Sequence, residues 1–246
     1  MSKKVARHVV AVGSGKGGVG KSTVTLNLAF ALGRRGWNVG LLDADLYGPD
    51  IPLMLNIKRE REATRWDFWR GGDVRLEPVE RDGLQVMSVG FLLAERQALT
   101  VAAPLLGAAL RQLVENVEWR SLDVLLVDLP PGTGDLQQQL LDVVALAGVV
   151  VVVGPQDVAH LDARKFMEFL SAADVRVLGG VENMVGLRCP HCGEHIDVFV
   201  PAAAERAIWA HGIPLLGRIP LDPDLTAQAD EFDRIADGLL ARLEAA

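Results

Sequence analysis

The sequence predicts an α/β protein with a doubly wound, mostly parallel sheet covered by helices on both faces. Short apolar runs recur along the 246 residues with helical segments between them, which favours parallel strands buried on both sides. Polar and glycine-rich motifs follow several of these runs, and such sheets hold ligands at the carboxyl ends of their strands. The expected strands are 9–12, 39–42, 84–89, 124–127, 149–153, 175–181 and 215–219.

The first run leads into a glycine-rich phosphate loop. Residues 15–22, G-K-G-G-V-G-K-S, meet the pattern G-x-x-x-x-G-K-S/T, in which backbone N–H groups surround phosphate oxygens. Lys21 would reach the β- and γ-phosphates, and the Ser22 hydroxyl would ligate Mg²⁺. Apolar residues at helical spacing follow, and Gly36 suits a C-terminal cap. Lys16 comes too early in the loop to duplicate Lys21 and therefore needs a separate role.

Two carboxylates follow the second run, in L-L-D-A-D-L-Y-G-P-D-I-P. One of Asp43 and Asp45 could hold water bound to Mg²⁺, and the other could orient an attacking water. The alternative is a loop in which both aspartates only cap turns. Gly48 and the prolines after it predict a shaped loop of the kind that senses nucleotide.

The run at 124–127 ends in Asp128 and continues L-P-P-G-T-G-D. Four apolar residues before an aspartate form the Walker B arrangement, which places the carboxylate in the second shell of Mg²⁺. Pro130 and Pro131, with the glycines after them, predict a tight turn beside the phosphate site. Asp135 is expected to cap the helix that begins at residue 136.

Cys189-Pro190-His191-Cys192 is a single C-x-x-C, which is half of a metal site. His191 or His195 could complete a zinc turn within one chain. Two chains facing each other would instead supply four thiolates, which suits a [4Fe–4S] cluster. Two unligated thiols are the third alternative. A thioredoxin-like redox motif is disfavoured because this C-x-x-C does not open a helix after the first strand.

The bulk properties narrow the class of protein. Half of the residues are hydrophobic, 23% are charged, and the net charge is −7, which argues against a nucleic-acid-binding face. The longest apolar run, 143–153, is shorter than the ~20 residues of a membrane span. No secretory signal precedes the first strand. We therefore expect a cytoplasmic, reduced protein that binds neither nucleic acid nor membrane.

Taken together, the motifs resemble the signature-lysine P-loop ATPases of the MinD/ParA superfamily, and within it the Mrp/ApbC branch of iron–sulfur cluster carriers. G-K-G-G-V-G-K-S looks like the deviant Walker A motif of that superfamily. The branch motifs lie between about residues 9 and 223 in the family's order, and they read D-A-D-L-Y-G-P-D-I-P, D-L-P-P-G-T-G-D, G-P-Q-D-V-A-H-L-D-A-R-K, V-E-N-M-V-G, C-P-H-C-G and L-G-R-I-P-L-D-P.

The resemblance implies one P-loop ATPase domain over residues 1–246 with a C-x-x-C insertion near 189–192. Such a protein would bind ATP with Mg²⁺ and hydrolyse it slowly. It would form a homodimer, bind a [4Fe–4S] cluster between the two subunits, and transfer that cluster to apo iron–sulfur proteins. The alternatives are a nucleotide-dependent spatial switch of the ParA or MinD kind, or an ATPase with a structural zinc at the C-x-x-C.

The resemblance also implies roles for individual residues. Lys16 would be the signature lysine that reaches the partner subunit's nucleotide, Asp45 would position water, and Asp128 would be the Walker B aspartate. The catalytic residues would be Lys16, Lys21, Asp45 and Asp128. Ser22 and Asp43 would bind Mg²⁺, and Cys189 and Cys192 of both subunits would bind the bridging cluster. The expected nucleotide contacts are Gly15, Lys16, Gly17, Gly18, Val19, Gly20, Lys21, Ser22, Thr23 and, at the adenine, Asn183, Pro220 and Asp222.

Three segments depart from the family pattern. The family often has serine where Asp50 stands, W-R-G-P where residues 100–104 read T-V-A-A-P, and a glycine-rich stretch where residues 200–204 read V-P-A-A-A. These departures bear on switch and dimer surfaces and leave the phosphate loop intact. The amphipathic tail, 229–246, is rich in acidic residues and is a poor lipid anchor, which argues against the spatial switch.

Overall fold

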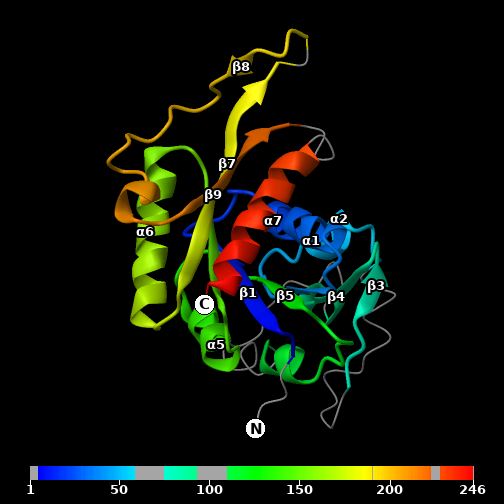
Figure 1. The fold of residues 1–246 in the computed structure, drawn as a ribbon. Coiled ribbons are helices and arrows are strands. Elements are labelled where there is room, and N and C mark those ends of the chain that lie inside the picture. The colour runs from blue at the N-terminus through cyan, green and yellow to red at the C-terminus, as the bar shows by residue number, and fades with distance from the viewer. Residues whose placement is uncertain (1–4, 59–74, 93–109, 190, 223–227, 246) are drawn as a thin grey trace.

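The computed structural model describes residues 5–58, 75–92, 110–189, 191–222 and 228–245. In these ranges a nine-stranded sheet has the order β3-β4-β2-β5-β1-β6-β7-β8, and β9 also pairs with β7 (Figure 1). The strands are β1 (His8–Gly13), β2 (Val39–Asp43), β3 (Val79–Arg81), β4 (Leu84–Ser88), β5 (Val124–Asp128), β6 (Gly148–Val153), β7 (Val177–Arg188), β8 (His195–Ile196) and β9 (Leu215–Leu221).

The predicted fold class is confirmed. All seven expected strands are present, and within the series β2-β5-β1-β6-β7 each strand pairs with the next in parallel. Every residue of β2, β5 and β6 is buried, because helices cover both faces and leave no side of these strands to solvent. The helices are α1 (Lys21–Arg34), α2 (Ile51–Met54), α5 (Asp135–Val143), α6 (Asp157–Ala172) and α7 (Ala229–Glu244), with 3₁₀ turns η2 (Val89–Leu92) and η3 (Ile208–His211).

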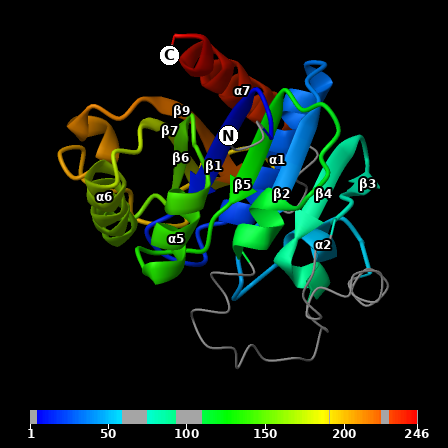
Figure 2. The ribbon, with the colours of Figure 1, turned by 90° about the horizontal axis from the view of Figure 1, so that it is seen from below.

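Seen from below, α1 and α7 lie on one face of the sheet, and α5 and α6 lie on the other (Figure 2). Helix α7 buries Phe232, Ile235 and Leu239 along one side, and Arg34 of α1 pairs with Asp233 of α7 at 2.6 Å. The apolar stripe of the C-terminal segment therefore faces the core. In the described part of the chain, no helix is both long and apolar enough to cross a membrane.

Two short antiparallel strands at the edges were missing from the prediction. Strand β3 pairs with β4 through a turn at Asp82 and Gly83, whose φ angles are 50° and 80°. Both are left-handed, as a two-residue hairpin turn requires. Strand β8 pairs with the last residues of β7.

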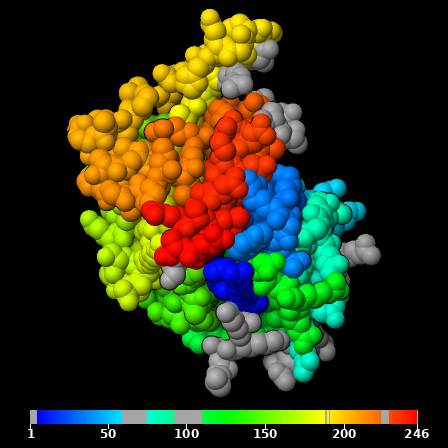
Figure 3. Space-filling model, in the orientation of Figure 1, coloured from blue at the N-terminus to red at the C-terminus, as the bar shows by residue number. Residues whose placement is uncertain are grey.

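Strand β7 runs beyond its neighbour β6. Its pairing with β6 ends at Glu182 opposite Val153, and Met184 and Gly186 then adopt left-handed φ angles of 63° and 68°. The prediction ended this strand at residue 181, whereas β7 continues to Arg188 and meets β8. We call the described residues 184–189 and 191–207 the cysteine arm. It rises from one end of the molecule, as the ribbon and the space-filling view both show (Figures 1 and 3).

Candidate nucleotide site and cysteine arm

The phosphate loop connects β1 to α1 and depends on its glycines. Gly18 and Gly20 have φ angles of 78° and 80°, a conformation that glycine adopts without steric cost. Gly15 packs on the backbone of α6 at Asp162, where a Cβ atom would collide. The predicted loop therefore has the backbone shape and the close packing that its glycines indicate.

Side-chain and backbone hydrogen bonds hold the loop from three sides. The Ser14 hydroxyl donates to the Lys16 carbonyl at 2.9 Å, and the Gly132 N–H donates to the Ser14 carbonyl at 2.9 Å. The Asn183 amide donates to the Val19 carbonyl, also at 2.9 Å. Elements far apart in the sequence thus position a loop that has no regular structure of its own.

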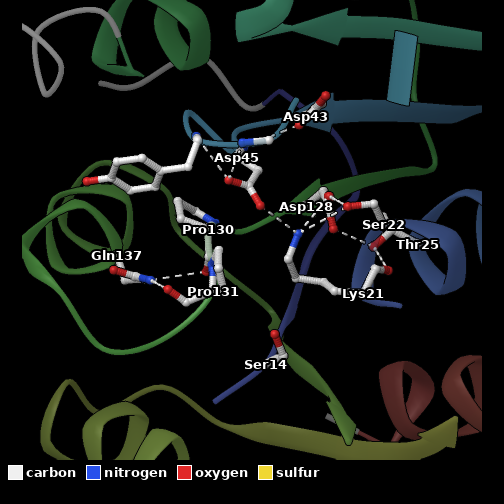
Figure 4. Close-up of polar contacts among 12 residues, drawn as sticks. Ser14, Lys21, Ser22, Thr25, Asp43, Asp45, Asp128, Pro130, Pro131 and Gln137 are labelled. Atoms are coloured by element: carbon white, nitrogen blue, oxygen red, sulfur yellow. Dashed lines mark hydrogen bonds and ion pairs between the residues drawn. The ribbon is translucent and has the colours of Figure 1, made fainter. Parts of the chain in front are cut away.

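Lys21 and Asp128 are the centre of the candidate site (Figure 4). The Lys21 ammonium lies 2.8 Å from Asp128 Oδ2 and 3.4 Å from Asp45 Oδ2. The Ser22 hydroxyl donates to Asp128 Oδ2 at 2.6 Å, and the Thr25 hydroxyl donates to Asp128 Oδ1 at 2.7 Å. The structure therefore brings together four residues predicted from separate motifs and adds Thr25, which lies one helical turn after Lys21.

Burial and charge act against each other at these groups. Burial by itself lowers the pKa of Lys21, but Asp128 and Asp45 outweigh it, so that this pKa lies above its ordinary value. Burial raises the pKa of Asp45, and Lys21 and the N–H groups of Gly48 and Tyr47 offset only part of that effect. The lysine is therefore held charged among carboxylates that have lost most of their water.

Asp43 lies deeper than the other two carboxylates. It is fully buried, accepts a hydrogen bond from Ser88 at 2.9 Å and one from the Asp45 N–H at 3.2 Å. Burial, and then the neighbouring Asp128, raise its pKa well above the ordinary value. Figure 4 shows its carboxylate directed away from Lys21. The carboxylate that contacts the Ser22 hydroxyl is that of Asp128. No direct contact between Asp43 and Ser22 therefore supports the predicted role of Asp43 at Mg²⁺.

The turn after Asp128 is fixed by a residue that the motifs did not indicate. The Gln137 amide donates to the carbonyls of Pro130 and Pro131, at 3.1 and 2.6 Å, and is buried. Asp135 is the first residue of α5, and Gly134 is its N-cap. The prediction that Asp135 caps this helix is therefore wrong. A glutamine nine positions from a motif aspartate gives no periodic signal in the sequence.

Lys16 differs from Lys21 in its surroundings. It is half-buried, and within the described ranges its ammonium makes no hydrogen bond or ion pair with the rest of the chain. Thr23 lies in the first turn of α1. The two lysines of this loop thus differ in their contacts. Lys21 is paired with carboxylates of its own chain, whereas the Lys16 ammonium is available for a ligand.

The three residues expected at the adenine lie at one edge of the sheet. Asn183 is opposite Ile219 in the pairing of β7 with β9, and Pro220 and Asp222 follow Ile219 at the same edge. Asn183 packs so closely on the phosphate loop that a Cβ atom at Gly20 would collide with its amide. The structure therefore brings Asn183 to the loop, and the contact of all three residues with adenine stays a prediction.

The cysteines form a compact turn at the tip of the arm. Cys189 and Cys192 are both free thiols, one half-buried and the other exposed. The Gly193 N–H donates to the Cys189 carbonyl, and the Cys189 N–H donates to the Glu194 carbonyl, both at 2.8 Å. Backbone N–H groups of Cys192 and His191 point at the Cys189 sulfur and lower the pKa of its thiol. The turn thus favours the thiolate, which is the form that binds metal.

Within the described ranges, one chain does not assemble a zinc turn. No three histidine, cysteine, aspartate or glutamate side chains converge there as metal ligands. His195 contacts Asp197 at 3.0 Å, and its ring lies against Gly186, where a Cβ atom would collide. The whole sequence has two cysteines, and two thiolates are only half of a four-thiolate centre. Such a centre therefore requires thiolates from another chain.

Two of the three departures from the family pattern lie in described residues, and they fall at the surface. Asp50 is exposed just before α2, and Val200 is 84% exposed on the cysteine arm. Residues 100–104 lie outside the described ranges. None of the departures that the structure describes alters a contact of the phosphate loop.

Comparison with known proteins gives consistent results. The family model described as ParA, NUBPL iron-transfer P-loop NTPase, matches residues 5–239. The chain is 42% identical to the iron-sulfur cluster carrier protein of Aquifex aeolicus, covering 95% of this chain and 63% of that protein. It is also 42% identical to that of Pseudomonas fragi, covering 91% and 76%. The iron-sulfur protein required for NADH dehydrogenase of Arabidopsis thaliana is 40% identical, covering 92% and 70%. The chain thus spans roughly two thirds to three quarters of these relatives.

Solved structures of similar proteins have the same fold as this chain. The nucleotide-binding protein from Archaeoglobus fulgidus in complex with ADP superimposes with a TM-score of 0.74 at 35% identity, covering 94% of this chain and 88% of that one. The MinD cell division ATPase of Pyrococcus furiosus, at 23% identity and a TM-score of 0.67 over 95% of this chain and 98% of that one, shares the fold.

Proposed function

The chain belongs to the family of NUBPL-type iron-transfer P-loop NTPases, and we propose that it is an ATP-hydrolysing carrier of iron–sulfur clusters. One observation carries the proposal. A single strand, β7, supplies Asn183 against the phosphate loop and ends beside Cys189 in a turn shaped for thiolates. Nucleotide and cluster would therefore be held at two points of one continuous element.

The site fits a magnesium nucleotide. The glycines leave the loop backbone open, and the first N–H groups of α1 have no partner within the helix, which suits phosphate oxygens. The oxygens of Ser22 and Asp128, 2.6 Å apart, are the hard donors that Mg²⁺ prefers. We propose that Ser22 ligates the metal, that Asp128 orients its shell, and that Asp43 adds negative charge from behind. The similar Archaeoglobus protein holds ADP.

The residues divide the work of hydrolysis. The bound magnesium nucleotide supplies the phosphoryl group, and catalysis of its transfer is mainly positioning and charge stabilisation. Lys21 neutralises the phosphates from within the loop. Asp45, held by the N–H groups of Tyr47 and Gly48 at 3.2 Å, orients the attacking water. Lys16 of a second copy reaches the same phosphates from outside.

The cluster is the cargo of the protein. Cys189 and Cys192 of two copies would supply the four thiolates of a [4Fe–4S] cluster, and apo iron–sulfur proteins would receive it. The homodimer is therefore required twice, once to complete the nucleotide site with Lys16 and once to complete the cluster site. The relatives that bear the name iron-sulfur cluster carrier protein support this cargo.

Anaerobic reconstitution tests the proposal. The protein incubated with iron and sulfide is expected to turn brown and to hold about four irons per two chains. Cys189→Ala should remain colourless. The matched control is His191→Ala, which changes an exposed side chain of the same turn and keeps both thiols, so it should retain the colour.

Two results would contradict the cluster assignment. One is a brown colour retained in Cys189→Ala, because the four thiolates would then not hold the cluster. The other is stoichiometric zinc instead of iron in anaerobically purified protein, particularly if His191→Ala loses that zinc.

A further inference from the structure

A buried histidine lies at the base of the cysteine arm, outside every motif to which a role was given. His160 of α6 is fully buried. Its Nε2 lies 3.4 Å from Glu182 Oε1, and its Nδ1 accepts the Ile208 N–H at 3.3 Å. The edge of the Trp209 ring packs on it with the centroids 5.8 Å apart. Both ring nitrogens are therefore occupied by partners from other elements.

These hydrogen-bond partners indicate which nitrogen of the His160 ring carries the proton. Because Nδ1 accepts a hydrogen bond, the proton of a neutral imidazole resides on Nε2 and is directed at Glu182. Burial raises the pKa of Glu182, but the hydrogen bonds from His160 and Arg218 outweigh burial and hold it below its ordinary value. Arg218 of β9 donates to Glu182 Oε2 at 2.6 Å. The result is a glutamate paired through both of its oxygens, with the His160 ring between it and the Ile208 N–H.

The two partners of His160 mark the two ends of the cysteine arm. Glu182 is the last residue of β7 that pairs with β6, two residues before the arm begins. Ile208 is the first residue of η3, where the chain has returned. The side chain of His160 thus contacts the chain just before the cysteine arm begins and just after it ends.

The preceding turn of α6 fastens the returning segment as well. Asp157 accepts the Ala203 N–H at 3.0 Å and pairs with Arg206 at 2.8 Å. The Pro155 carbonyl accepts the Ala202 N–H at 2.7 Å. The arm is therefore attached to the start of α6 by backbone and side chain alike.

The same helix also supports the phosphate loop. Its backbone at Asp162 is in contact with Gly15, one half-turn beyond His160. On the strand side, Asn183 next to Glu182 bonds to the Val19 carbonyl of the loop. A displacement of the loop on binding nucleotide would therefore press on both elements that His160 joins.

We propose that His160 is a positioning residue that couples the phosphate loop to the cysteine arm through α6. The inference rests on the proposed function and adds how nucleotide binding would regulate the cysteines. Nucleotide in the loop shifts α6 and β7 together, and the hydrogen bonds of His160 to Glu182 and Ile208 transmit that shift to the thiols. Without those bonds, the two sites work but do not respond to each other.

Two substitutions separate the hydrogen bonds from the volume of the ring. His160→Leu keeps an apolar side chain in the core but can neither donate to Glu182 nor accept from Ile208. His160→Gln can do both, since its amide has a donor and an acceptor. His211→Gln, at an exposed histidine, is the matched control.

The measurement is the alkylation rate of Cys189 and Cys192 by iodoacetamide in reduced, cluster-free protein, with and without Mg·ADP. In the wild type we expect Mg·ADP to change that rate about fivefold or more, the lower range of coupling between sites. His160→Leu should lose this response while its affinity for ADP stays the same. His160→Gln and His211→Gln should retain it.

Three results would overturn the inference. They are a wild-type rate that ignores Mg·ADP although ADP binds, a full response in His160→Leu, or a response lost equally in His160→Gln. If His160→Leu does not fold, Asp157→Ala, which loosens the same attachment from a more exposed position, replaces it with the same expectation. Failure of the wild type to bind ADP or a cluster is a different outcome, which refutes the proposed function itself.

Discussion

The phosphate centre and the tip of the cysteine arm are built in opposite ways. Around Lys21, ammonium, carboxylates and hydroxyls are buried and satisfy one another within a single chain. At the tip, Cys192 and the residues after it are exposed, and the described residues bring no third metal ligand to the thiols. The contrast shows that the polar groups around Lys21 are already paired with one another within one chain, whereas the thiols at the tip gain no further metal ligand from the described residues.

The largest effect on stability is expected from Lys21→Met. The substitution keeps the apolar stem but leaves the buried Asp128 and Asp45 without their cation. Breaking a buried pair in this way costs about 3–5 kcal/mol, so the free energy of unfolding should fall by that amount at neutral pH. Urea denaturation without nucleotide measures it.

The loss in Lys21→Met should also depend on pH. Without the lysine, the buried carboxyl groups around it can become neutral as the pH falls, so the difference from the wild type should shrink on the acid side. An equal loss at all pH values would mean that the carboxyl groups do not become neutral when the lysine is absent. No loss at all would mean that the pairing around Lys21 contributes nothing to stability before nucleotide binds.

Lys16→Met sharpens the comparison within the same loop. Its ammonium has no partner in the described chain, so stability should change by less than about 0.5 kcal/mol. ATP should still bind through Lys21. Hydrolysis should fall by about 10³-fold, the lower range for a cation supplied in trans. Steady-state phosphate release checks this, and normal turnover would refute the role of Lys16 across the dimer.

Glu182→Gln tests the base of the arm. Glutamine keeps the shape but loses the charge that pairs with Arg218, which is worth about 1.5–3 kcal/mol. Because the pKa of Glu182 is lowered on folding, its stabilisation is present above the ordinary value of 4.5 and is lost as the pH falls below it. The wild type should therefore lose stability faster than Glu182→Gln over that acid range in thermal unfolding. Parallel curves would contradict this.

The smallest effect on stability is expected at the tip. Cys192→Ser, at an exposed thiol, should change the free energy of unfolding by less than about 0.5 kcal/mol, and we expect it to abolish the proposed cluster binding. In the wild type, the lowered pKa of Cys189 keeps it a thiolate to lower pH than a free cysteine, so its alkylation should begin at lower pH. A pH series followed by peptide mass spectrometry would reveal this, and a midpoint at the free-cysteine value would count against the preformed turn.

The sequence predicted the structure best where residues of one kind recur in a simple pattern along the chain. Continuous apolar runs predicted the parallel strands, and the glycine-rich motif predicted the loop that connects the first strand to a helix. Strand β3 was not predicted because it has only three residues, V-E-R, of which Val79 alone is apolar. The D-G pair at Asp82 and Gly83 was an available signal for that hairpin.

Long-range polar contacts are what the sequence could not reveal. Gln137 and His160 act through partners brought close only by the folded sheet and helices, and no spacing along the chain marks them. Asp43 and Asp45 look equivalent in D-A-D, yet β2 ends at Asp43, so the two side chains need not share a direction. One is therefore fully buried beside Ser88, and the other lies against Lys21.

Strand β7 continues past its last residue paired with β6 and carries the cysteine turn away from the core, held on the way where Leu187 lies opposite Leu221 of β9. From Asn183 to Arg188, at ~3.3 Å per residue, it extends at most about 20 Å. A rotation of about 10° at its base would therefore displace its end by about 3 Å. That displacement exceeds the ~2.3 Å of a metal–thiolate bond. If the cysteines of two copies hold one metal centre, as proposed, a rotation of this size about Glu182 would be large enough to make or break coordination there.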